Sequence, residues 1–193
     1  MNYTDRQIEI INAATELINI GGIQQLTTKA LADKIGFTEP ALYRHFKNKS
    51  DILSSVLNYF SYTLKSRIGG LLEEDLNGIQ KLEEIIKFQF EHFSKHPAIV
   101  MVIFAETSFQ YDKKLSHAVH NILKNKKQLV ESIIKQGQEG GTIRSDLDTG
   151  QLASVFMGSI RFTILQWRLN NYSTDLTKEG KLLSVTIRKL IGR

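Results

Sequence analysis

Apolar residues recur at helical spacing along almost the whole chain, and this pattern limits the fold more than any other feature of the sequence. No segment shows the alternation of apolar and polar residues that a half-buried strand requires. Only 2 Pro and 13 Gly are spread over the 193 residues, which favours helices. We therefore predict an all-α fold of about nine helices. The first of them carries its apolar side at Ile8, Ile11, Ala14, Leu17 and Ile18.

Turn residues divide the chain into predicted helices and two predicted domains. Gly21 and Gly22 end the first helix, and Gly36 separates the two short helices that follow. We place a small domain at residues 1–50 and a larger helical domain at 51–193, connected by a helix from residue 50 to about 68. The remaining helices are predicted at residues 77–96, 97–109, 113–139, 149–170 and 175–191.

Composition excludes several classes of function. The chain has no Cys, which excludes cysteine nucleophiles, disulfides and Cys-ligated metal centres. The longest apolar run, residues 98–105, is far shorter than the roughly 20 residues that span a bilayer. No P-loop, G-x-S-x-G or G-x-G-x-x-G occurs, and an S-x-x-K string at residues 132–135 lacks its companion motifs. We expect a cytoplasmic protein that is not an enzyme and has no cofactor.

Positive charge is concentrated near the N-terminus. The whole chain has a formal net charge of +5, which permits an acidic partner but does not identify one. Residues 27–50 alone carry +3, whereas residues 51–193 carry a diffuse +4. The segment 27–50 is therefore the best candidate for contact with nucleic acid.

The same segment has the layout of a helix-turn-helix. Thr27 and Thr38 can cap two short helices, Gly36 lies in the turn, and Pro40 is tolerated in the first turn of the second helix. The strings at residues 27–32, 36–38 and 41–49 resemble the DNA-binding signature of the TetR family of bacterial transcriptional regulators. The resemblance covers about residues 4–60 and, more loosely, the C-terminal half.

Chemistry and this resemblance together suggest roles for the residues of the motif. Hydroxyls and free N–H groups at helix starts bind phosphate, as lysines do, and side chains on the first turns of the second helix reach base edges. The candidate phosphate-binding residues are Thr27, Thr28, Lys29, Thr38, His45 and Lys49; the candidate base readers are Glu39, Pro40, Ala41, Tyr43 and Arg44; and the expected core is Leu31, Ile35, Leu42 and Phe46. Taken singly, these residues also fit plain structural roles as caps, core or solvated rim.

The last two predicted helices carry apolar stripes that we interpret as a dimer interface. By resemblance they would pair with their copies in a second subunit and present two recognition helices to a pseudo-palindromic site on double-stranded DNA. The alternative is that they form only the core of one subunit. The candidate interface residues are Val155, Phe156, Ser159, Phe162, Leu182, Val185, Thr186 and Leu190.

A stretch rich in aromatic residues lies between the motif and these helices. The resemblance implies a pocket there for a small apolar or amphipathic effector, while core packing is the simpler explanation. A basic residue would suit an acyl or carboxylate ligand, and Glu91 or Glu106 would suit a cation, so the charge of the effector is left open. The candidate pocket residues are Phe90, Phe93, Met101, Phe104, Phe109, Arg161, Gln166 and Trp167.

The sequence therefore predicts a ligand-responsive homodimeric repressor that binds DNA. A second hypothesis is a DNA-bound architectural or division-site factor that answers to a protein partner. A remote third is a helical metal protein, since the histidines at 92 and 96, or at 117 and 120, have helical spacing. Neither histidine pair has a clear third ligand, so we expect no metal.

Overall fold

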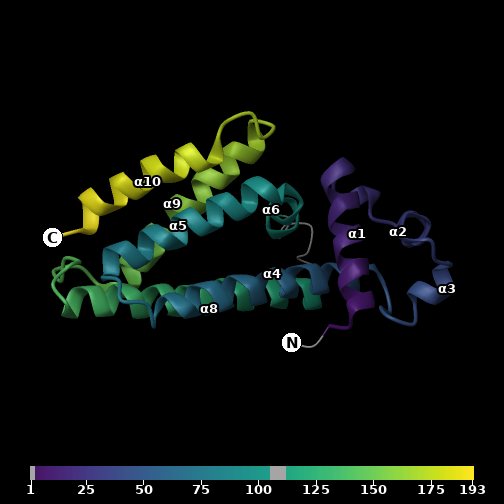
Figure 1. The fold of residues 1–193 in the computed structure, drawn as a ribbon, viewed down its shortest axis with the longest axis horizontal. Helices are drawn as coiled ribbons and strands as arrows, with labels where there is room; N and C mark the ends of the chain where they lie inside the picture. The colour runs from purple at the N-terminus through teal and green to yellow at the C-terminus, as the bar shows by residue number, and fades with distance from the viewer. Residues whose placement is uncertain (1–2, 105–111) are drawn as a thin grey trace. The chain divides into compact units, whose positions relative to one another are not determined.

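The computed structural model describes residues 3–104 and 112–193, and these residues form nine α-helices and a short 3-10 helix (Figure 1). In the described ranges the extended backbone pairs only at an isolated bridge between Ile143 and Gly192. The all-α prediction is confirmed. The helices are α1 (Asp5–Gly21), η1 (Ile23–Gln25), α2 (Thr28–Ile35), α3 (Glu39–Leu42), α4 (Lys49–Leu71), α5 (Gly78–Lys95), α6 (Pro97–Ile103), α8 (Lys113–Glu139), α9 (Thr149–Leu169) and α10 (Leu176–Ile191).

The contacts group the chain into two compact units. The first comprises residues 1–63 and 96–122, and the second comprises residues 64–95 and 123–193. The predicted boundary at residue 50 divides the chain differently, because α6 and the beginning of α8 belong with the N-terminal helices. Helix α6 contacts α1. The sequence pattern indicates where helices end, but it does not indicate which distant helices contact one another.

The first unit is built around α1. This helix contacts η1, α2 and α6, and α2 contacts α3. Thr4 caps α1 with a reciprocal capping box, in which its hydroxyl accepts from the backbone N–H of Gln7 and its own N–H donates to the Gln7 side chain. Ile10, Ala14 and Ile18 of α1 are fully buried, so one face of this helix supplies much of the unit's core.

The second unit depends on close approaches at glycine. Helix α10 lies alongside α5 and also contacts α9 (Figure 1). A Cβ on Gly78 would lie 2.6 Å from the Cα of Gly137, so α5 and α8 approach too closely there for a side chain. A Cβ on Gly180 would lie 2.8 Å from the Phe90 ring, so α10 accommodates a large α5 side chain. These glycines allow helix packing rather than turns.

The predicted end of the connecting helix, α4, is wrong. The helix expected to end at about residue 68 continues through Gly69 and Gly70 to Leu71. Neither glycine has a positive φ, so neither acts as a helix C-cap. Ile68 and Leu71 are fully buried, and their burial offsets the roughly 1 kcal/mol that each glycine costs in a helix interior.

Candidate nucleic-acid interface

Local hydrogen bonds fix the turn between α2 and α3. The Thr27 hydroxyl accepts from the N–H of Ala30 at 3.0 Å, and the Thr38 hydroxyl accepts from the N–H of Ala41 at 3.4 Å. Gly36 ends α2 in the left-handed conformation, with φ 68° and ψ 33°. Glycine adopts this conformation without the steric cost that a Cβ imposes. The sequence-based prediction of two capped helices around a glycine turn therefore agrees with the backbone.

Helix α3 is shorter than the candidate residues of the motif suggest, because these continue past Leu42 to His45. The α-helical part ends at Leu42, and the next turn tightens. The N–H of Arg44 donates to the carbonyl of Ala41, and that of His45 to Leu42, each three residues back. The N–H of Phe46 returns to Leu42, four residues back. Residues 39–46 thus form one continuous helical rise with a tightened second half.

The candidate base readers face outward while their neighbours hold the element in place. Tyr43 is 49% exposed, whereas Leu42 and Phe46 are 1% and 5% exposed. Pro40 and Arg44 are also exposed. The buried pair anchors the element to the small core, and the exposed side chains are free to enter a groove. This separation of faces is what a recognition helix requires.

Glu39 is engaged by the neighbouring helix. The Thr28 hydroxyl donates to a Glu39 carboxylate oxygen at 2.6 Å. The bond joins the first turn of α2 to the first turn of α3, so it fixes the relative position of the two helices. One oxygen of the Glu39 carboxylate is used, and the other remains for a base donor such as the cytosine amino group.

The two candidate phosphate-binding lysines lie in different settings. Lys29 is exposed at the start of α2. The ammonium group of Lys49 donates to the carbonyl of Ile23 at 2.8 Å, and partial burial lowers its pKa. Lys49 therefore ties η1 to the start of α4, and Lys29 is the better placed of the two to contact a phosphate.

Sequence reasoning missed an aromatic stack beside the motif. The His45 ring lies on the Phe37 ring with centroids 6.3 Å apart, and the Arg6 guanidinium carbon is 4.0 Å from the Phe37 centroid. Arg6 lies in α1, far from the motif in sequence. Its cation–π contact holds Phe37 against α1 and supports the position of His45.

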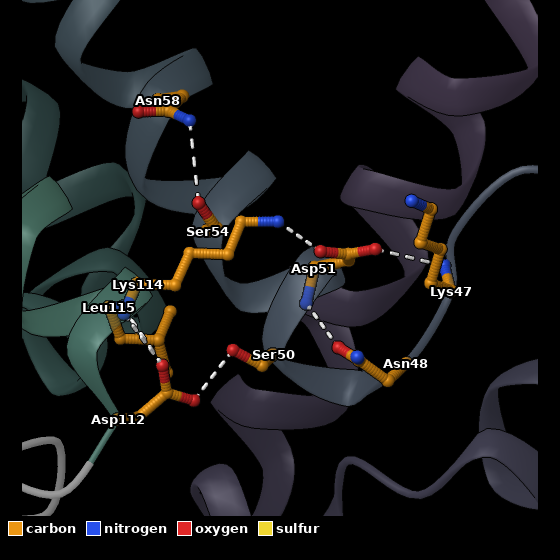
Figure 2. A network of polar contacts seen from close by, with 9 residues as sticks. All are labelled: Lys47, Asn48, Ser50, Asp51, Ser54, Asn58, Asp112, Lys114 and Leu115. Atoms are coloured by element: carbon orange, nitrogen blue, oxygen red, sulfur yellow. Dashed lines mark hydrogen bonds and ion pairs between the residues drawn. The ribbon is translucent and has the colours of Figure 1, made fainter.

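A polar network joins the beginning of α4 to the beginning of α8, and sequence reasoning missed it as well. Figure 2 shows Asp51 at its centre. The Asp51 carboxylate accepts from the Lys114 ammonium group and, at 3.0 Å, from the backbone N–H of Lys47. Asn48 accepts from the backbone N–H of Asp51 at 2.9 Å. The bond to Lys114 is the main cause that lowers the pKa of Asp51.

Asp112 forms the other half of this network. The Ser50 hydroxyl donates to one Asp112 oxygen at 2.6 Å, and the backbone N–H groups of Lys114 and Leu115 donate to the other at 3.1 Å (Figure 2). The Ser50 bond is the first cause of the lowered Asp112 pKa. Asp112 is thus the N-cap of α8 and a contact to α4 at once. An Asp directly before a helical segment could have indicated the N-cap from the sequence. It could not have indicated that Ser50 of α4 is a hydrogen-bond partner.

The predicted pocket residues are divided between the two units. Phe90, Phe93 and Trp167 are buried in the second unit, Arg161 is partly buried there, and Gln166 is exposed. The Trp167 indole N–H donates to the carbonyl of Thr174 at 2.9 Å, which holds the turn before α10. Met101 and Phe104 belong to the first unit, and Phe109 and Glu106 lie outside the described residues.

Most predicted interface residues on α9 and α10 are exposed in the single chain. Phe156 is not, because it is 1% exposed and belongs to the core of the unit. Ser159 is partly buried and Thr186 is exposed. A Cβ on Gly158 would meet no heavy atom within 4 Å, so space is open beside it. The predicted interface residues that are large, apolar and exposed are Val155, Phe162, Leu182, Val185 and Leu190.

The described residues contain no group of three or more His, Asp or Glu side chains that could hold a metal ion. In the same residues, no helix is both long enough and apolar enough to traverse a bilayer.

Two protein-family models match almost the whole chain. The model of the bacterial regulatory proteins of the tetR family matches residues 10–56, and that of the C-terminal region of YsiA-like proteins matches residues 59–191. The chain belongs to the TetR family. The resemblance stated from the motif is therefore confirmed, and the protein is a DNA-binding transcriptional regulator.

Relatives within the TetR family extend over most of the chain. The fatty acid metabolism regulator protein of Bacillus subtilis is 26% identical over 171 residues, which cover 89% of this chain and 88% of that protein. The solved structure of Bacillus subtilis FadR in complex with stearoyl-CoA has a TM-score of 0.80 and 25% identity, and covers 95% of this chain and 96% of the other. The nucleoid occlusion factor SlmA of Aliivibrio fischeri is 21% identical over 175 residues, or 90% of this chain and 89% of that protein.

Proposed function

We propose that this TetR-family protein is a cytoplasmic, homodimeric repressor that leaves its operator when a long-chain acyl thioester binds the second unit. The observation that carries the DNA-binding half of the proposal is the geometry of α3. Tyr43 and Arg44 are exposed on an element that buried Leu42 and Phe46 hold in place. Such a rigid element with an open polar and aromatic face can read base edges without reorganising first.

The acyl class of the effector is supported by similarity and by the second unit's composition. The Bacillus subtilis relative is a fatty acid metabolism regulator, and the solved Bacillus subtilis FadR contains stearoyl-CoA. The second unit buries the large aromatic side chains Phe93 and Trp167, an apolar environment that suits an acyl chain.

Substitutions in α2 and α3 are expected to have two different effects on operator binding. Arg44→Ala is expected to weaken binding to the operator by about 10- to 100-fold and to reduce the preference for operator over unrelated DNA, because a base contact is lost. Lys29→Ala is expected to weaken binding to both DNAs alike and to reduce the slope of log affinity against log salt by about one per subunit. Fluorescence anisotropy with DNA from the promoter beside the protein's own gene, at several salt concentrations, measures both.

Lys65→Ala provides the matched control. Lys65 is exposed on α4, outside the helix-turn-helix, so its loss should leave affinity and salt slope unchanged. If Arg44→Ala and Lys29→Ala both bind as the wild type does, the assignment of the DNA-binding face is wrong.

If the effector is an acyl thioester, its binding should release the protein from DNA. Stearoyl-CoA at micromolar concentration is expected to lower the affinity of the wild-type protein for operator by at least about tenfold, which corresponds to a coupling free energy in the usual range of 1–3 kcal/mol. Coenzyme A alone should have no effect, because it lacks the acyl chain. The measurement is anisotropy of labelled operator during titration with each compound.

The SlmA relatives favour a second candidate, a DNA-bound factor that answers to a protein partner. That function predicts many dispersed binding sites on the chromosome and no release by stearoyl-CoA. Chromatin immunoprecipitation of the tagged protein therefore separates the two functions.

A further inference from the structure

Three helices of the second unit bring polar side chains together in its interior. Gln89 of α5 is 2% exposed, although its side chain is a polar amide. The Lys126 ammonium group of α8 donates to its side-chain oxygen at 2.7 Å. The positive charge of Arg161, from α9, acts on Lys126. The cluster of Gln89, Lys126 and Arg161 is therefore formed by α5, α8 and α9.

The pair of Gln89 and Lys126 has more hydrogen-bond donors than acceptors in the described part of the chain. The buried Gln89 Nε2 has no hydrogen-bond partner in the structure, although buried amide groups are nearly always hydrogen-bonded. Lys126 can donate three hydrogen bonds, and its partner in the described part of the chain is an amide oxygen rather than a carboxylate. Burial and, secondarily, Arg161 lower the pKa of Lys126 to about 7. A partly buried cation without a carboxylate partner is costly.

We propose that the Lys126 ammonium group and the Gln89 side-chain N–H bind an oxyanion in the head group of the effector, either a carboxylate or a phosphate. The inference builds on the proposed ligand-responsive function and adds the charge of the ligand, which the sequence left open between acidic and basic. An oxyanion accepts hydrogen bonds from both donors and neutralises the partly buried positive charge of Lys126. A cationic ligand would add a further positive charge beside Lys126.

Binding of paired ligands to paired variants tests the site. The fluorescence of Trp167, the only Trp in the chain, reports binding of stearate, stearoyl-CoA and uncharged octadecanol. Lys126→Met is expected to weaken binding of the anionic ligands by about 10- to 100-fold, since a charge-assisted hydrogen bond is lost, and to leave octadecanol binding unchanged. Gln89→Leu should act in the same direction. Lys127→Met is the matched control, because Lys127 is exposed and pairs with Glu131 at 3.6 Å.

The pH dependence provides a second readout. Because an oxyanion requires the charged form of Lys126, and the pKa of that group is about 7, wild-type affinity for stearate should fall as the pH rises from one unit below this value to one unit above it. In the described residues, the one other charge shown to act on Lys126 is that of Arg161. The Lys126→Met profile should be flat.

The outcomes separate this proposal from the proposed function. Because the thioester of stearoyl-CoA is uncharged, weaker binding of stearate by Lys126→Met indicates contact with a carboxylate, and weaker binding of stearoyl-CoA indicates contact with a phosphate. Wild-type affinity of Lys126→Met for both ligands would overturn the proposal. If the wild type binds neither acyl ligand, the acyl effector is wrong, and the melting temperature in inorganic phosphate decides the oxyanion site: a rise that Lys126→Met abolishes supports it, and no rise overturns it.

Discussion

Phe162→Asp is expected to convert the protein into a monomer and to weaken operator binding by about 100-fold or more, because two linked reading elements bind far more tightly than one. Phe162 is 60% exposed on α9, and Val185 and Leu190 on α10 are 52% and 55% exposed. Large apolar side chains gathered on one face of a single chain indicate an association surface. A carboxylate at its centre would be buried without a partner in the dimer.

The single chain itself should tolerate this substitution. Because Phe162 is mostly exposed, Phe162→Asp should leave the helical content and the thermal unfolding of the isolated subunit nearly unchanged. Sedimentation equilibrium gives the oligomeric state, and anisotropy with the operator gives the affinity. Ile20→Asp is the matched control, since Ile20 is 78% exposed but lies on α1. A Phe162→Asp protein that remains dimeric would contradict the assignment of this face.

Features encoded in adjacent residues could be predicted from the sequence. The caps at Thr27 and Thr38 and the turn at Gly36 were all expected, because each depends on side chains within a few residues of the backbone groups that they satisfy. The exposed faces of α9 and α10 were also anticipated, because helical periodicity separates one face from the other. Phe156 was misplaced, since an apolar residue next to the stripe looks the same whether it faces the core or a partner.

Features formed by residues distant in sequence could not be predicted in this way. The Lys126–Gln89 bond joins side chains 37 residues apart, and the Lys49–Ile23 bond joins groups 26 residues apart. A polar residue on a helix gives no local indication of what the next helix places against it. The charge of the ligand was therefore left open by the sequence, and the pair of Gln89 and Lys126 now favours an anion.

The strongest effect on stability is expected from Phe90→Ala, at about 3–5 kcal/mol in the free energy of unfolding, the usual range for a buried Phe. Phe90 is 1% exposed. Phe90 was a predicted pocket residue. Its ring, however, lies against α10, so close that a Cβ on Gly180 would be 2.8 Å from the ring. The ring therefore packs α5 against α10. Urea unfolding followed by circular dichroism gives the free energy, and Phe88→Ala is the matched control because Phe88 is only partly buried on the same helix.

The contact between Phe90 and Gly180 can be isolated by a double-mutant cycle. Gly180→Ala alone should cost about 1–3 kcal/mol, since the added methyl group overpacks the site. In the Phe90→Leu background the same substitution should cost markedly less, because the smaller side chain leaves room for the methyl group. A coupling energy of at least about 0.5 kcal/mol is therefore expected. If the two substitutions have additive costs, or if Phe90→Ala is as stable as the wild type, Phe90 does not pack α5 against α10. Phe90 would then again be a candidate pocket residue.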